Sequence, residues 1–240
     1  MILVISILII STLAGGLLSN SLDFKPETIR YPLIFAGSFL FSITIIHILP
    51  EVYSSGMNPM RIGLYVLIGF FLQQFLEYFT SGIEHGHHHK GHEFSGVSKW
   101  SMVIALVIHS ILEGALLTHD SPFHEKHESY SLLAGVLLHK VPAAFALMTT
   151  LKSGERFTLP QWGILVLFSL ASPIGLVLSG YTLNISSNAL TILFAVVSGS
   201  FLHISTTIFV ESSPNHHFGV KKIMVSLLGA AIAILSEFGF

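Results

Sequence analysis

Two neighbouring apolar stretches of the 240-residue chain each contain a histidine, and one also contains a glutamate. His109 and Glu113 are four residues apart, so on a helix they project from one face, about one turn apart. An imidazole and a carboxylate in this arrangement suit a borderline divalent cation such as Zn²⁺. A hydrogen bond that only stabilises the helix is an equally good interpretation of these two residues taken alone.

A second imidazole favours the metal interpretation. His139 lies in Leu-His-Lys-Val-Pro at 138–142, and Pro142 cannot donate to the carbonyl of Leu138. Such a gap in helical hydrogen bonding is tolerated in lipid only where it faces protein or water. His139 would complete a set of three nitrogen and oxygen ligands with room for a fourth group. An open shell fits a transported ion better than a permanently bound one.

Lys140 follows this histidine directly. A protonated ammonium cannot ligate a metal and repels a nearby divalent ion. We expect its partner to be Glu113 or another intramembrane acid, or its charge to stand where a second cation would otherwise sit. Snorkelling to an interface is the weaker alternative, because Lys140 lies in the middle of its apolar stretch.

Other polar side chains inside apolar stretches could line a transport pathway or mark a water interface. The pathway residues predicted from the sequence are Ser110, Lys140, His47, Glu77 and His203.

Two loops are rich in histidine. Loop 83–99 contains five candidate metal-binding histidines, and a merely polar linker is the alternative. These are His85, His87, His88, His89 and His92. A second cluster of His, Asp and Glu lies at 119–128.

The composition places these residues in a membrane protein. Hydrophobic residues make up 52% of the chain and charged residues only 10%, whereas soluble domains carry about a quarter charged residues. A soluble enzyme, a nucleic-acid-binding protein and a disordered chain are excluded. With no cysteine, a thiolate metal site is excluded as well.

Eight apolar stretches have the length of membrane-spanning helices, which need about 20 residues each. We therefore predict an all-α integral membrane protein with eight transmembrane helices and a single transmembrane domain over 1–240. The first stretch lacks a basic region and a cleavage site, so we interpret it as a retained span. The stretches are 2–19, 32–53, 61–82, 100–118, 130–151, 161–180, 189–210 and 221–238.

The basic residues predict the orientation. With the N-terminus outside, eight Lys and Arg fall in inner loops and two in outer loops. Both termini are then outside, and loop 83–99 is cytoplasmic. The plasma membrane or an inner membrane is the expected location.

A short internal similarity predicts a repeat. Residues 36–40 read Ala-Gly-Ser-Phe-Leu and residues 198–202 read Ser-Gly-Ser-Phe-Leu, in spans of opposite direction. Inverted repeats are typical of transporters and predict a 3+2+3 arrangement of the helices. A chance match of small residues explains the similarity equally well.

These motifs resemble the ZIP (Zrt/Irt-like) family of divalent-metal transporters. The similar segments are His-Ser-Ile-Leu-Glu-Gly at 109–114, His-Lys-Val-Pro at 139–142, His-Ile-Leu-Pro-Glu at 47–51, the histidine-rich loop and 198–202. The resemblance implies eight helices, both termini outside and a metal site built by the fourth and fifth helices.

This chain departs from many relatives at several positions. Ser110 stands where many have Asn, and Ala143 where many have Glu after the proline. Lys140 and Ser172 replace metal-ligating acids of two-metal relatives, so the resemblance implies a one-metal transporter.

The sequence therefore predicts a transporter that moves Zn²⁺, or a related ion such as Fe²⁺ or Mn²⁺, into the cytoplasm. The ion is substrate rather than cofactor, no cofactor or nucleic acid is expected, and the other partners are the lipid bilayer and, in a homodimer, a second copy. An intramembrane metal-dependent hydrolase is the main alternative, although no His-Glu-x-x-His motif is present. A metal sensor that does not transport is the third.

Overall fold

The computed structural model describes residues 1–21, 26–80, 96–117, 129–151, 157–182, 186–211 and 219–237. These residues are helical apart from short turns, as the all-α prediction requires. The loop predicted at 83–99 ends earlier in the structure, because a helix already begins at Gly96. Backbone hydrogen bonding extends this helix by one turn ahead of its apolar part. The five loop histidines and the 119–128 cluster lie outside the described residues.

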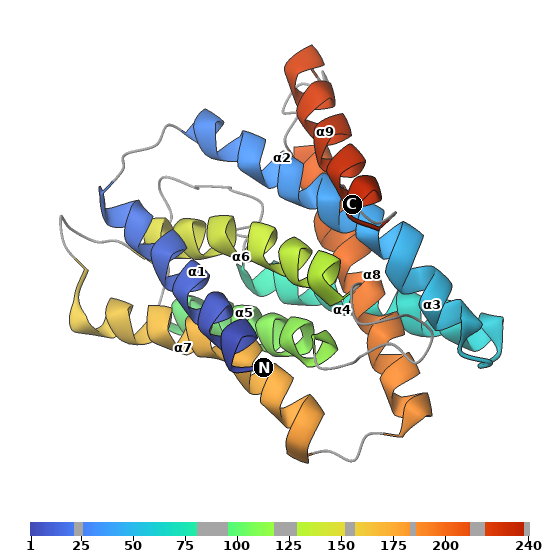
Figure 1. Ribbon diagram of the computed structural model, residues 1–240. Coiled ribbons are helices and arrows are strands. Elements are labelled where there is room, and N and C mark those ends of the chain that lie inside the picture. Colours follow the sequence, from blue (N-terminus) through green and yellow to red (C-terminus); the bar gives the residue numbers. More distant parts are fainter. Residues whose placement is uncertain are drawn as a thin grey trace.

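Eight helical segments follow one another along the described residues (Figure 1). In one of them α2, the π-helical turn η1 and α3 continue without a break, and in another η3 extends α7. The elements are α1 (Ile2–Ser21), α2 (Pro26–Ile43), η1 (Thr44–Ile48), α3 (Leu49–Ser54), α4 (Pro59–Thr80), α5 (Gly96–Leu116), α6 (Ser129–Leu151), α7 (Leu159–Val177), η3 (Leu178–Thr182), α8 (Ser187–Glu211) and α9 (Val220–Glu237).

Six of these segments are long and apolar enough to cross a membrane, within the described residues. They begin with α1, α2, α4, α6, α7 and α8. The apolar part of α5 is shorter, at Trp100–Leu116. The helix α9 carries Lys221, Lys222 and Glu237 within its 18 residues. The chain is thus a multi-pass membrane protein, and the count of eight spans stays a prediction.

The helix α6 lies at the centre of the packing. It is the most deeply buried of the six spans, and it runs on through Pro142 to Leu151. One end packs into a core with α2, α4 and α8, through residues such as Val136. The other end packs with α5 and α7, through residues such as Leu147. The two ionisable residues between these ends, His139 and Lys140, are therefore held away from solvent.

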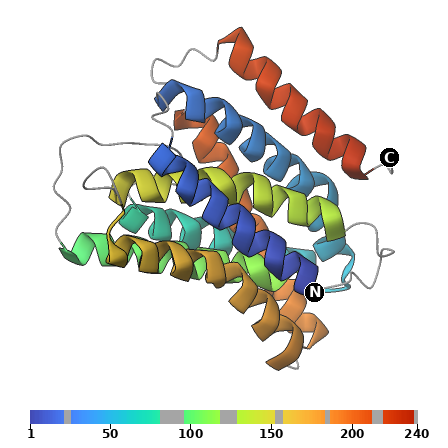
Figure 2. The ribbon, with the colours of Figure 1, turned by 60° about the vertical axis from the view of Figure 1, so that its left-hand side comes forward.

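The helices pair in a regular way (Figures 1 and 2). The most extensive contacts join α4 to α8, α5 to α7, α2 to α9 and α1 to α6. Both views show α9 at the edge of the molecule, lying along α2. The outer face of α4 exposes large apolar side chains, among them Leu67, Phe71 and Phe75. A hydrocarbon environment suits such a surface.

Candidate metal centre

The helix α5 presents a histidine and a glutamate on one face, as their spacing predicts. Nε2 of His109 lies 2.9 Å from Oε1 of Glu113. Both atoms are inaccessible to solvent, and the residues are 3% and 1% exposed. A carboxylate removed from water to this extent must be stabilised by a positive charge or by strong hydrogen-bond donors.

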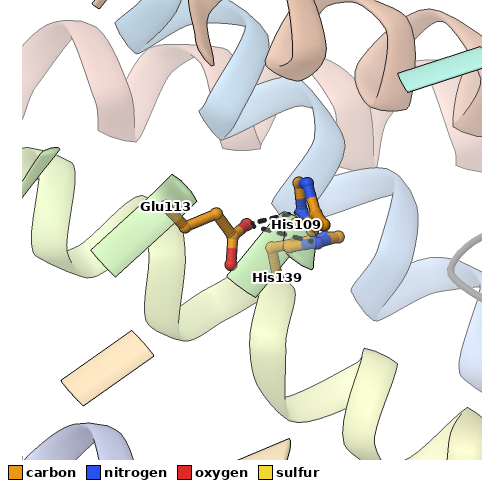
Figure 3. A group of neighbouring side chains, drawn as sticks. All are labelled: His109, Glu113 and His139. Carbon is orange, nitrogen blue, oxygen red and sulfur yellow. Dashed lines mark ion pairs between the residues drawn. The ribbon is translucent and has the colours of Figure 1, made fainter. Parts of the chain in front are cut away.

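The helix α6 brings a second imidazole to the same carboxylate. Nε2 of His139 lies 3.7 Å from Oε1 of Glu113. The rings of His109 and His139 stand edge to face, with their centroids 5.9 Å apart. Figure 3 shows the carboxylate pointing toward both rings. One ligand atom from each of the three side chains lies within 4.8 Å of the others.

Two nitrogen donors and one carboxylate in such a cluster form an open three-ligand set. Zn²⁺ binds imidazole nitrogen and carboxylate oxygen at about 2.0–2.2 Å, so a small closure of the cluster around a cation would suffice. Water or a passing group could take the fourth position. Within the described residues, His109, Glu113 and His139 form the single group of at least three such side chains close enough to share a metal ion.

Close packing of α5 against α7 positions the glutamate. A Cβ on Gly114 would overlap the backbone carbonyl of Ser172, and a Cβ on Gly175 would overlap that of Ile111. The two backbones therefore touch, which only glycine allows at these points. Because Glu113 directly precedes Gly114, its place in the cluster depends on this contact.

Lys140 lies beside the cluster and is 1% exposed. Its Nζ donates hydrogen bonds to Oγ of Ser110 and Oγ of Ser172, both at 2.8 Å, and lies 4.4 Å from the centroid of the Phe168 ring. The hydroxyl of Ser172 in turn donates to the carbonyl of Ser110 at 3.0 Å. The sequence predicted Glu113 or another acid as the partner of this ammonium. Lys140 interacts electrostatically with the buried carboxylate of Glu113, and two serines and an aromatic ring, which the sequence did not predict, also surround it.

Two more predicted pathway residues form a separate pair between α4 and α8. Nδ1 of His203 lies 3.3 Å from Oε2 of Glu77. The His203 ring also meets the ring of Phe70 edge to face, at 4.8 Å between centroids. The pair lies within one turn of the end of α4, which leads into the histidine-rich loop.

The last predicted pathway residue, His47, lies in η1 and takes part in a different cluster. Its Nδ1 is 2.8 Å from Oε2 of Glu237 at the end of α9, and its Nε2 is 3.7 Å from Oε2 of Glu51. This cluster is separate from the group around Glu113. Glu237 was not among the predicted residues, although an acid at the end of an apolar helix is a signal that could have found it.

Two further buried side chains were not among the predicted site residues, and one of them, Ser200, contacts His109. Ser200 of α8 lies 3.4 Å from Nδ1 of His109 and donates to Gln73 of α4 at 2.7 Å, measured from Oγ in both cases. Helical spacing could have found both residues. Gln73 precedes Glu77 by four residues and Ser200 precedes His203 by three, so each pair shares one face of its helix.

Comparison with known proteins agrees with this chemistry. Residues 85–237 match the family described as ZIP zinc transporter. A curated relative, zinc transporter ZIP9 of Micropogonias undulatus, is 27% identical over 156 residues. That alignment covers 60% of this chain and 49% of the relative, so the chain spans about half the length of the relative that it matches.

Proposed function

Because this chain belongs to the ZIP zinc transporter family, we propose that it moves Zn²⁺, or a related divalent ion, through the membrane by way of His109, Glu113 and His139. Members of this family are transporters rather than enzymes, which sets aside the intramembrane hydrolase. Transport of metal is the family's activity. The choice of ion, the direction and the site residues belong to the proposal.

The observation that carries the proposal is the buried cluster of two imidazoles around one carboxylate. All three residues are at most 3% exposed, and their ligand atoms lie within 4.8 Å of one another. Imidazole and carboxylate together accept Zn²⁺, Fe²⁺ and Mn²⁺, so this ligand set alone does not select among them. A three-ligand set leaves one coordination position for water or a passing group, which fits a transported ion better than a permanently bound one.

We assign one metal ion to this site. The ammonium of Lys140 donates to Ser110 and Ser172. The family resemblance implies that Lys140 and Ser172 stand where two-metal relatives carry metal-ligating acids. A fixed positive charge there repels a second divalent ion.

We propose that the polar groups on either side of the site line the transport pathway. The Glu77–His203 pair lies near the end of α4 that precedes the histidine-rich loop. The His47 cluster lies toward the other end of the bundle, close to where the chain turns from α3 into α4. An ion passing from one to the other would meet His109 and Glu113 between them.

The proposed direction of transport rests on the orientation that the basic residues predict. Eight Lys and Arg on the side of loop 83–99 against two on the other favour a cytoplasmic position of that loop. Its histidines would then receive an ion delivered inward. The plasma membrane or an inner membrane remains the proposed location.

The pairing of helices supports the 3+2+3 repeat. In such a repeat, α1, α2 and α4 correspond in turn to α7, α8 and α9. The two helices between them, α5 and α6, correspond to each other. The repeat therefore exchanges the α1–α6 contact with the α5–α7 contact. It also exchanges the α2–α9 contact with the α4–α8 contact. These four contacts between helices are the most extensive among the described residues. The third residue of each similar segment, 36–40 and 198–202, is a serine that donates a hydrogen bond to the paired helix. Ser38 of α2 donates to Ser226 of α9, and Ser200 of α8 donates to Gln73 of α4, both at 2.7 Å.

Ion flux into proteoliposomes tests the proposal. The reconstituted protein should take up Zn²⁺, and His109→Ala or Glu113→Ala should abolish uptake while the protein remains inserted. Thr12→Val is the matched control, because its buried hydroxyl bonds only within α1, to the carbonyl of Leu8. Uptake near the wild-type rate in a well-inserted double variant would refute the site assignment.

Competition for uptake tests the choice of ion. Unlabelled Fe²⁺, Mn²⁺ and Cd²⁺ are added in turn to vesicles taking up labelled Zn²⁺. We expect each to compete, because the ligand set accepts all of them. If only one of these ions reduced the uptake of labelled Zn²⁺, the selectivity would arise outside the three ligands.

A further inference from the structure

The imidazole of His47 lies between two carboxylates that come from different parts of the chain. Its Nε2 lies 3.7 Å from Oε2 of Glu51, one turn further along the same helical segment. Its Nδ1 lies 2.8 Å from Oε2 of Glu237, at the end of α9. The side chains of His47, Glu51 and Glu237 are only 9%, 8% and 10% exposed. Ionisable groups placed in this way inside a membrane protein usually serve its function.

The two carboxylates face different nitrogens of the ring, so they have different tasks. The ring nitrogens point in different directions, and an ion bound to one of them lies away from the other. His47 and Glu51 repeat the spacing of His109 and Glu113, in which Nε2 faces the carboxylate four residues later. Nε2 of His47 and Glu51 can therefore receive an ion together, and Nδ1 is left to Glu237.

The contact with Glu237 sets the orientation of the ring. His47 lies in the π-helical turn η1, where the backbone N–H of Leu49 donates to the carbonyl of Thr44, five residues earlier. Such turns are rare and often lie at functional sites. The torsion that rotates a histidine ring is broad and roughly two-fold, so the backbone alone does not decide which nitrogen faces Glu51. A carboxylate fixed beside Nδ1 does decide it.

Close packing of α9 along α2 holds Glu237 in its place (Figures 1 and 2). A Cβ on Gly229 of α9 would overlap the backbone carbonyl of Phe35, so the two helices approach as closely as glycine allows. Ser38 of α2 also donates to Ser226 of α9 at 2.7 Å. The helix is thus attached to α2 at two points, and its last turn brings the carboxylate to η1.

We infer that Glu237 is a positioning residue, which holds the imidazole of His47 with Nε2 toward Glu51 so that this pair can receive the transported ion. The inference rests on the proposed function, in which the His47 cluster lines the pathway. Histidines that bind metals commonly donate their other ring N–H to a carboxylate or a similar acceptor, which fixes the orientation of the ring. The arriving ion replaces the proton on Nε2, as it does whenever histidine binds a metal.

Two simpler roles of Glu237 predict different results. If the carboxylate only attracts cations by its charge, Glu237→Gln should impair uptake as much as Glu237→Ala. Positioning, by contrast, is retained in Glu237→Gln, because the amide oxygen still accepts a hydrogen bond from Nδ1. If the contact only fastens α9 to the bundle, then Ser226→Ala, which removes another link between α9 and α2, should have a similar effect.

The measurement is the initial rate of Zn²⁺ uptake into proteoliposomes over a range of Zn²⁺ concentrations. We expect Glu237→Ala to raise the concentration that gives half-maximal uptake about 10-fold, as for other residues that orient a metal-binding histidine. The maximal rate should stay near that of the wild type, because the ligands around Glu113 are unchanged. Glu237→Gln should stay close to the wild type in both quantities. Ser226→Ala is the matched control and should also behave like the wild type.

A double-variant cycle tests whether Glu237 acts through His47. Without the imidazole there is nothing for the carboxylate to orient. In the His47→Ala background, Glu237→Ala should therefore cause no further rise in the concentration for half-maximal uptake. Residues with independent roles would instead show effects that multiply.

The inference is overturned by independent effects of the two substitutions, by equal impairment in Glu237→Ala and Glu237→Gln, or by a Ser226→Ala variant that resembles Glu237→Ala. Wild-type kinetics in Glu237→Ala would refute the positioning role and leave the transport proposal standing. A wild-type protein that takes up no Zn²⁺ would refute the proposed function, and the inference with it.

Discussion

Nζ of Lys140 lies 2.8 Å from Oγ of Ser172, so that an ammonium on α6 reaches a hydroxyl on α7. The same ammonium reaches Ser110 on α5 at 2.8 Å, and Ser172 donates to the Ser110 carbonyl at 3.0 Å. Three helices at the proposed metal site therefore meet at one buried positive charge. Both the stability of the protein and the number of metal ions that it binds should depend on this junction.

Ser172→Ala should destabilise the protein by about 1–3 kcal/mol, because it removes an acceptor from a buried ammonium and a donor from a buried carbonyl. The measurement is the midpoint of thermal unfolding in detergent. Ser169→Ala is the matched control on the same helix, since its buried hydroxyl donates within α7, to the carbonyl of Val166. Equal shifts in the two variants would mean that the junction adds no stability of its own.

Lys140→Asp should increase the metal bound per protein molecule. It replaces the positive charge by a carboxylate between Ser110 and Ser172, where a second ion could then bind. Elemental analysis of the purified, metal-loaded protein measures this ratio. Lys140→Met, which removes the charge without adding a ligand, should bind as much metal as the wild type. An unchanged ratio in Lys140→Asp would remove the main support for the one-metal interpretation.

Gly114→Ala should strongly reduce both stability and uptake. The added methyl group would overlap the backbone carbonyl of Ser172, so α5 and α7 must separate, and Glu113 moves with them. Overpacking of this kind costs about 1–3 kcal/mol. Gly163→Ala in α7 is the control, because a Cβ there meets nothing within 4 Å. It should be neutral or slightly stabilising. Normal uptake by Gly114→Ala would show that the contact does not position the site.

Replacing the loop histidines should leave transport in place. A variant in which His85, His87, His88, His89 and His92 all become Ser keeps the intramembrane ligands, so it should still take up Zn²⁺ with an altered apparent affinity or regulation. Initial rates over a range of Zn²⁺ concentrations measure both. Complete loss of flux would mean that the loop is part of the transport path itself.

Local features of this protein could be predicted from its sequence. The helices follow from long apolar stretches, and the short distance between His109 and Glu113 follows from a spacing of four residues. Both depend on interactions within one helix, which neighbouring residues dictate. The extra turn at Gly96 was missed, because the apolar pattern marks the hydrocarbon part of a helix and not the end of its hydrogen bonding.

The partners of side chains on different helices required the tertiary structure. The sequence indicated that Lys140 needs compensation and suggested Glu113, with which it does interact electrostatically. Nothing in the sequence indicated its hydrogen bonds to Ser110 and Ser172, 30 and 32 residues away. Similarly, nothing local joins Ser200 to Gln73, which precedes it by 127 residues. Such pairs depend on how far each helix is rotated and how closely it approaches its neighbour. Contacts between glycines and backbone carbonyls on facing helices set both, and only the folded protein brings those surfaces together.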